Sequence, residues 1–123
     1  MVDLQDLIID SPQEGKFKVH RTSMTSDEIF KLERERIFDR CWLYVGHESE
    51  VENAGDYRRR MVAGRPIFFN RDQEGEIRVF LNTCPHRGAM ICRRDEGNAK
   101  IFQCFYHAWN FNSKGELIGI PDE

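Results

Sequence analysis

The chain carries the stretch Cys84-Pro85-His86-Arg87-Gly88 and, further on, the stretch Cys104-Phe105-Tyr106-His107-Ala108-Trp109. Seventeen residues separate His86 from Cys104, so the two stretches belong to different loops. Each offers one thiolate sulfur and one imidazole nitrogen, a ligand combination typical of zinc and iron–sulfur sites. The pattern therefore predicts one metal centre built from two loops, and a fold that brings those loops together.

The spacing within the first stretch favours two neighbouring metal atoms over one. Structural zinc sites are usually spaced C-x₂₋₄-C with H-x₃₋₅-H, whereas a single residue separates Cys84 from His86. A Cys and a His this close at a tight turn can address two adjacent metal atoms. Two alternatives stay open from the residues alone: a Cys₂His₂ zinc site, and two unrelated hairpins whose Cys and His side chains merely pack.

The order C-x-H followed by C-x-x-H resembles the Rieske [2Fe–2S] family, in which two His replace two Cys on one of the irons. The resemblance implies that Cys84 and Cys104 bind the buried iron. It implies equally that His86 and His107 bind the outer iron, with two sulfides bridging the pair. The implied fold is mainly β: a Rieske iron–sulfur domain of small antiparallel sheets with two cluster-binding hairpin loops, preceded by an N-terminal arm and one helix.

A supporting shell is expected from Arg87, Gly88, Tyr106 and Trp109. Gly88 lets the backbone approach the cluster without a side chain in the way. Tyr106 and Trp109 either shield the cluster by packing, as aromatic residues near buried sites usually do, or form an electron path. Arg87 belongs, together with Arg93 and Arg94, either to a solvated loop or to a basic rim for an acidic partner.

Short strands separated by turn signals predict an all-β core, independently of the resemblance. The expected strands cover 42–45, 57–62, 67–70, 77–81, 101–103, 109–111 and 116–118. The residues 72–75 between two of them have a hairpin composition, and 95–98 are expected to form a turn. Both Cys–His pairs are expected at hairpin tips, where rigid strands position a site on loops.

The N-terminal part divides into an arm and a helix. Residues 1–24 are expected to form an extended or irregular arm, because Ser11-Pro12 and Gly15 interrupt any periodicity. A Ser or Thr cap followed by Asp27 and Glu28 predicts a helix over 26–39. We assign 25–123, including this helix, to one Rieske [2Fe–2S] domain, and a catalytic domain is absent from the chain.

Composition bounds the class of protein. Hydrophobic residues make up 40% and charged residues 32% of the 123 residues, which is typical of a single soluble globular domain. The net charge of −3 gives no reason to expect nucleic acid or an anionic membrane as partner. An apolar run of membrane-spanning length is missing, and the acidic start Met1-Val2-Asp3 does not resemble a signal peptide. These features predict a cytoplasmic location.

Two cysteines lie outside the motifs, and both are expected to be small buried hydrophobes: Cys41 and Cys92. A disulfide between them is disfavoured in a reducing compartment. High-potential Rieske proteins carry an extra, disulfide-bonded Cys in each ligand loop. The absence of these cysteines here resembles the low-potential subgroup, which implies a potential at the lower end of the range from about −150 to +300 mV.

Several segments resemble the large (α) subunits of aromatic-ring-hydroxylating dioxygenases over roughly residues 25–121. They are Glu33–Val51, Gly55-Asp56-Tyr57, Arg65-Pro66-Ile67, Asn82–Gly88 and Cys104–Trp109. A Rieske ferredoxin would not usually carry the arm and helix. In such α subunits a mononuclear Fe(II) is held by two His and a carboxylate. His20 and His47 do not form that motif, so no catalytic residue is assigned in this chain.

The resemblance implies an oxidoreductase of aromatic hydrocarbon catabolism, of which this chain carries only the electron-transfer portion. Electrons would come from NADH through a reductase, with a ferredoxin or the reductase as the direct donor. They would pass to the mononuclear Fe(II), which activates O₂ for ring hydroxylation. Neighbouring α subunits and a β subunit are the implied oligomeric partners. The alternative is a free-standing Rieske-type ferredoxin that serves as an electron carrier.

Overall fold

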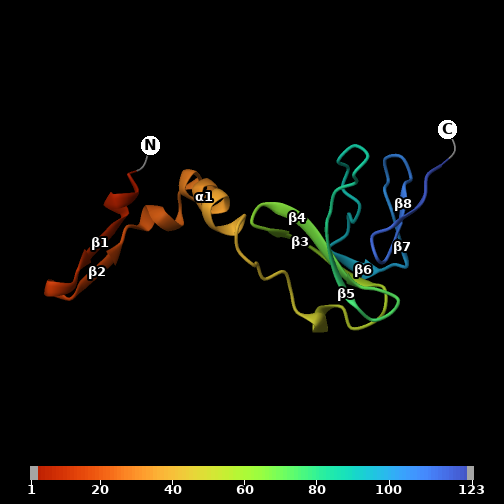
Figure 1. The fold of residues 1–123 in the computed structure, drawn as a ribbon, viewed down its shortest axis with the longest axis horizontal. Coiled ribbons are helices and arrows are strands. Elements are labelled where there is room, and N and C mark those ends of the chain that lie inside the picture. The colour runs from red at the N-terminus through yellow and green to blue at the C-terminus, as the bar shows by residue number, and fades with distance from the viewer. Residues whose placement is uncertain (1–2, 122–123) are drawn as a thin grey trace. The chain divides into compact units, whose positions relative to one another are not determined.

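A computed structural model describes residues 3–121 (Figure 1). The chain forms two compact units, residues 1–42 and 43–123. Helix α1 (Asp27–Glu33) lies in the first unit, together with the N-terminal segment. The domain boundary after residue 24 stays a prediction from the sequence. Within the described residues no helix is long and apolar enough to cross a membrane.

The arm contains a β-hairpin where irregular chain was expected. Strands β1 (Ile8–Ser11) and β2 (Lys16–Val19) pair antiparallel. The residues that suggested irregularity form the turn: Pro12 opens a short 3₁₀ segment and Gly15 takes a φ of 63°, which glycine adopts without a Cβ penalty. Two more 3₁₀ segments, Leu4–Leu7 and Arg21–Met24, flank the hairpin.

The predicted helix is present, with an altered last turn. Ser26 caps α1, since its side-chain oxygen accepts a hydrogen bond from the Ile29 N–H, and Asp27 and Glu28 occupy the first turn. A π-helical segment, Arg34–Phe38, continues the helix and closes with a bond from the Asp39 N–H to the Arg34 carbonyl. The prediction over 26–39 thus agrees with a helical run over 27–38.

The strand expected at 42–45 does not form. The chain there is extended without regular secondary structure. Val45 packs on a small apolar cluster of Val51, Ile67 and Phe69, whereas Trp42 and Tyr44 are exposed. The alternation of apolar side chains is therefore real, but this segment has no ladder partner in the described structure.

Four antiparallel strands form the first sheet of the second unit, in the order β5-β4-β3-β6 (Figure 1). They are β3 (Asp56–Val62), β4 (Arg65–Arg71), β5 (Ile77–Leu81) and β6 (Glu96–Asn98). β6 occupies the residues expected to form a turn. Gly97 pairs with Tyr57, and a Cβ on Gly97 would lie 2.7 Å from the Tyr57 hydroxyl oxygen. The glycine thus makes room for the tyrosine ring across the strands.

The second sheet holds β7 (Ile101–Gln103), β8 (Asn110–Asn112) and β9 (Leu117–Gly119) in that order. Aromatic contacts join the two sheets: the Phe68 ring on β4 lies 5.0 Å from that of Phe102 on β7, which meets Tyr57 on β3 edge-on. This core also contains Phe111, Cys84, Cys92 and Cys104. The core therefore reaches directly to the two cysteines of the motifs.

Candidate metal centre

The first Cys–His loop lies between β5 and β6 and is closed at its base by Asn82. The buried Asn82 side chain accepts hydrogen bonds from the Ile91 and Cys92 N–H groups and donates one to the Cys92 carbonyl, at 2.8–3.1 Å. Because β5 and β6 are not neighbours in the sheet, this loop is not the hairpin tip that the sequence suggested. A side-chain bridge takes the place of strand pairing.

The second loop joins β7 to β8 and is a hairpin tip, as expected. Its backbone repeats that of the first loop. The Cys104 N–H donates to the Trp109 carbonyl and the Ala108 N–H to the Cys104 carbonyl, both at 2.9 Å. In the first loop the Cys84 N–H donates to the Ala89 carbonyl at 2.7 Å and the Gly88 N–H to the Cys84 carbonyl at 2.8 Å.

The fifth residue of each loop adopts the left-handed region, with φ of 74° at Gly88 and 55° at Ala108. A Cβ on Gly88 would find only Thr83, at 4.0 Å. The glycine thus satisfies a backbone conformation that costs other residues energy. An alanine does not indicate a positive φ, so the left-handed backbone at Ala108 could not be predicted from the sequence.

The two motif thiols lie together at the inner side of the loops. Cys84 and Cys104 are each 2% exposed. Burial raises the pKa of the Cys84 thiol, a hydrogen bond from the His86 N–H opposes that shift, and the neighbouring Cys104 thiol adds to it. Backbone N–H groups that approach a sulfur favour its thiolate, the form that binds metal.

The two imidazoles lie together nearer the surface. The His86 and His107 rings are 4.6 Å apart, with His86 exposed and His107 half-buried. Trp109 stacks on His86 at 4.7 Å with an interplanar angle of 7°, and the Tyr106 ring lies 3.9 Å from His107. The predicted aromatic shell therefore contacts the imidazoles directly and holds their planes.

The donor set fits a cluster of two irons. It consists of a buried thiol pair and a more exposed imidazole pair, as expected for two ligands on each iron. No three His, Cys, Asp or Glu side chains within residues 3–121 are close enough together to hold a single metal ion. Cys84 and Cys104 would hold the inner iron, and the two imidazoles the outer one.

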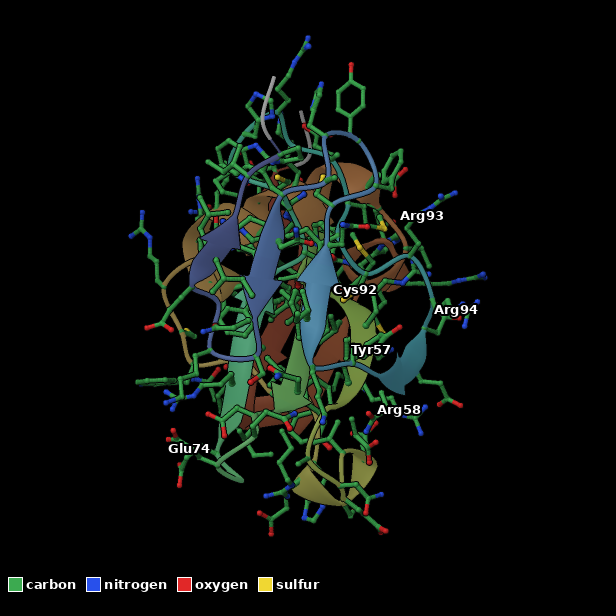
Figure 2. The ribbon with its side chains drawn as sticks, turned by 90° about the vertical axis from the view of Figure 1, so that its right-hand side faces the viewer. Tyr57, Arg58, Glu74, Cys92, Arg93 and Arg94 are labelled. Atoms are coloured by element: carbon green, nitrogen blue, oxygen red, sulfur yellow. The ribbon has the colours of Figure 1, made fainter. Side chains whose placement is uncertain are left out.

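The arginines of the first loop contact the aromatic residues of the second. The Arg87 guanidinium lies 5.6 Å from the centre of the Tyr106 ring, and that of Arg93 lies 4.8 Å from Phe105. Figure 2 shows Arg93 and Arg94 extending from the edge of the unit, with Cys92 inside. The sequence identified these arginines, but the ring contacts follow from the fold.

The remaining cysteines differ in environment. Cys92 is buried as predicted, and burial raises its pKa to about 12, which makes it a poor nucleophile and ligand. Cys41, predicted to be buried, is exposed. The adjacent Trp42 is exposed too, so no apolar core surrounds Cys41. All four cysteines are free.

Known proteins are similar to this chain in sequence and in fold. The Rieske [2Fe-2S] domain family matches residues 41–123. Biphenyl 2,3-dioxygenase subunit alpha from Rhodococcus jostii (strain RHA1) is 46% identical over 99 residues, which are 80% of this chain and 22% of that subunit.

Solved structures of oxygenases are also similar to this chain. Naphthalene 1,2-dioxygenase from Rhodococcus sp. bound to indole matches with a TM-score of 0.77 at 41% identity, covering 84% of this chain and 23% of that one. A quaternary ammonium Rieske monooxygenase, whose structure concerns carnitine oxidation by gut microbiota and inter-subunit electron transfer, matches with a TM-score of 0.72 at 37% identity, covering 81% of this chain and 27% of that one. The chain thus spans about a quarter of the length of these relatives.

Proposed function

The chain belongs to the Rieske [2Fe–2S] domain family, and we propose that it is the electron-transfer portion of an aromatic-ring-hydroxylating dioxygenase α subunit. The observation that carries the proposal is the paired donor set, with two buried thiols beneath two imidazoles nearer the surface. The mainly β fold predicted from the motifs is confirmed, and its structural relatives are Rieske oxygenases.

The proposed cluster ligands are Cys84, His86, Cys104 and His107. When bound, the cluster supplies a one-electron couple. The two thiols are buried away from water, whereas His86 is exposed. Trp109 stacks on His86 and so holds the plane of the imidazole ring. A hydrogen bond from the second ring nitrogen of a ligand histidine to a partner group would orient the imidazole and tune the metal.

The proposed partners follow from the relatives. A ferredoxin or a reductase would donate the electron, and a mononuclear non-haem iron, in a part of the protein that the described chain does not contain, would receive it. The quaternary ammonium monooxygenase structure concerns inter-subunit electron transfer, which supports an acceptor in a neighbouring α subunit. The named dioxygenases act on biphenyl and naphthalene, so we propose an aromatic substrate for the whole protein.

A free-standing Rieske ferredoxin is the weaker candidate. All three relatives described above are oxygenases or subunits of oxygenases. The similarity to naphthalene dioxygenase covers 84% of the chain, which is more than residues 41–123 alone contribute. This extended match favours the oxygenase.

Metal loading of matched variants tests the ligand assignment. The chain, reconstituted with iron and sulfide, should bind two irons and two sulfides and show visible absorption. Cys84→Ser and Cys104→Ser should lose the cluster. Cys92→Ser should keep it, because Cys92 is buried but not a proposed ligand. For the imidazoles, His86→Ala should lose cluster content and His47→Ala should keep it, because the His47 ring caps a 3₁₀ turn and is not a proposed ligand.

Two results would contradict the proposal. One is a colourless protein that binds a single zinc, which would support the structural zinc site. The other is full cluster content in Cys84→Ser, which would remove Cys84 from the ligand set.

A further inference from the structure

We propose that Arg87 and Arg93 hold the two ligand loops against each other by cation–π contacts with Tyr106 and Phe105, and so keep the cluster ligands in register. The proposal rests on the proposed function, because it assigns the cluster to these loops. Arg87 and Arg93 act through other residues and are therefore positioning residues.

The geometry places two contacts of the same kind between the loops. Each joins an arginine of the first loop to an aromatic ring of the second, at 5.6 Å for Arg87–Tyr106 and 4.8 Å for Arg93–Phe105. Both separations lie within the roughly 6 Å over which a guanidinium is attracted to a ring face. Since Phe105 and Tyr106 are consecutive, the tip of the second loop is held at two adjacent points.

The rings of Phe105 and Tyr106 are not buried in the core. Phe105 is 60% exposed and Tyr106 is 51% exposed, although large apolar side chains gain most from burial. An arginine lying over a ring removes apolar surface from water while its own charge stays solvated. The two pairs therefore stabilise a loop tip that the core does not reach.

The two ligand loops are not joined by a covalent bond between their side chains. All four cysteines are free, so a disulfide does not connect the loops. The first loop is closed on itself by Asn82, and the second by the pairing of β7 with β8. These closures shape each loop separately. The ring contacts act between the loops, alongside the stacking of Trp109 on His86.

Arg94 provides a matched control. It neighbours Arg93, is exposed and carries the same charge, and Figure 2 shows it extending from the same edge. Among the described residues its charge acts on the Tyr57 hydroxyl, and it makes no cation–π contact with a ring of the second loop. Arg87→Gln, Arg93→Gln and Arg94→Gln remove the same charge, so a simple electrostatic effect would appear in all three.

The experiment measures iron release to a chelator from the reconstituted chain. Each contact should slow release about two- to five-fold, the factor that corresponds to one exposed cation–π pair. Arg87→Gln and Arg93→Gln should release iron faster by that factor, and Arg94→Gln should match the wild type. Arg87→Lys and Arg93→Lys should keep most of the effect, because lysine retains a cation over the ring. In Phe105→Leu, the further change Arg93→Gln should add little.

The rate of amide hydrogen exchange at residues 104–109 of the metal-free chain measures how far the same contacts stabilise the second loop when no cluster is bound. Exchange should rise in the Arg87 and Arg93 glutamine variants and not in Arg94→Gln. Equal behaviour of all three glutamine variants in both measurements would overturn the proposal, as would lysine variants that release iron as fast as the glutamine variants. A wild-type chain that binds no cluster would contradict the proposed function instead, while the exchange data would still decide the loop contacts.

Discussion

Gly88 and Ala108 show how a single backbone angle serves the site. Both follow their cysteine by four residues, both donate their N–H to that cysteine's carbonyl, and both have positive φ. A glycine adopts this region freely, whereas a residue with a Cβ is destabilised there by roughly 1–2 kcal/mol. The two loops meet the same geometric demand with different residues.

Exchanging these residues should therefore have opposite effects. Gly88→Ala should lower the free energy of unfolding by about 1 kcal/mol, although its new Cβ meets no close neighbour. Ala108→Gly should raise it slightly, by about 0.5 kcal/mol, because relief of strain exceeds the added flexibility of the unfolded chain. Urea unfolding of the metal-free chain measures both. A neutral Gly88→Ala would mean that the backbone angle is not what the glycine provides.

The buried carboxylate of Asp72 should make the stability of the fold depend on pH in acid. Burial alone would raise its pKa, but hydrogen bonds from the Glu76 N–H, from Arg78 and from the Glu74 N–H outweigh burial, and the pKa lies below its usual 3.8. The charged form therefore stabilises the fold at pH values above about 3.8. This contribution is lost as the pH falls through the lowered value.

The wild type should lose the contribution of the Asp72 charge to its stability as the pH falls below about 4. Asp72→Asn should be less stable than the wild type at pH 7 and should show a flatter decline in acid, because its side chain does not titrate. Urea midpoints at pH 7, 4 and 3 compare the two proteins. Parallel curves would show that Asp72 does not contribute through its charge.

At the scale of elements, Asn82 does for the first loop what strand pairing does for the second. Its three hydrogen bonds join the two ends of a loop whose flanking strands are not neighbours. An asparagine just before a metal-binding cysteine gives little sign of this role in the sequence, because the bridge spans ten residues and depends on the fold.

Asn82→Ala should reduce the free energy of unfolding by about 2–4 kcal/mol, since it leaves the buried N–H and carbonyl of Cys92 and the partly buried N–H of Ile91 without their side-chain partner. Asn82→Asp should be destabilised as well, because one carboxylate oxygen can still accept from both N–H groups but the other places a buried negative charge against the Cys92 carbonyl. Thermal unfolding and cluster content give the comparison. Variants as stable as the wild type, with unchanged cluster content, would contradict the bridge.

The strands show which local signals carry information. The β3–β4–β5 segments and the three strands of the second sheet agree with their alternation and turn residues. β6 was mistaken for a turn, because the need for Gly97 arises only from the ring of Tyr57 across the strands. The 42–45 segment was mistaken for a strand, because apolar alternation does not supply a hydrogen-bonding neighbour. Pairing between distant segments was the missing information in both cases.

At the scale of the whole molecule, the four proposed ligands stay a prediction, made from residue types whose order in the chain is unusual. The sequence could not specify the contacts that hold them. The stacking of Trp109 on His86, the arginines over Phe105 and Tyr106, and the burial of both thiols all arise from tertiary packing. Cys41 illustrates the limit, since its apolar neighbour suggested burial where the structure exposes both residues.

The division of the chain leads to a further prediction. Both apolar clusters and both ligand loops lie within residues 43–123. A protein restricted to these residues should fold and bind the cluster with the same iron and sulfide content as the full chain. Circular dichroism and metal analysis measure this. Loss of the cluster on removing residues 1–42 would show that the first unit is required for the site.

The most direct test of the central claim is pulsed EPR of the reduced, reconstituted chain with and without ¹⁵N-labelled histidine. Coordination of one iron by His86 and His107 predicts a rhombic signal with couplings from two directly bound nitrogens, both of which change on labelling. His86→Cys should leave only one such coupling. A reduced cluster without any histidine nitrogen coupling, or a spectrum unchanged in His86→Cys, would contradict the assignment of the two imidazoles as ligands.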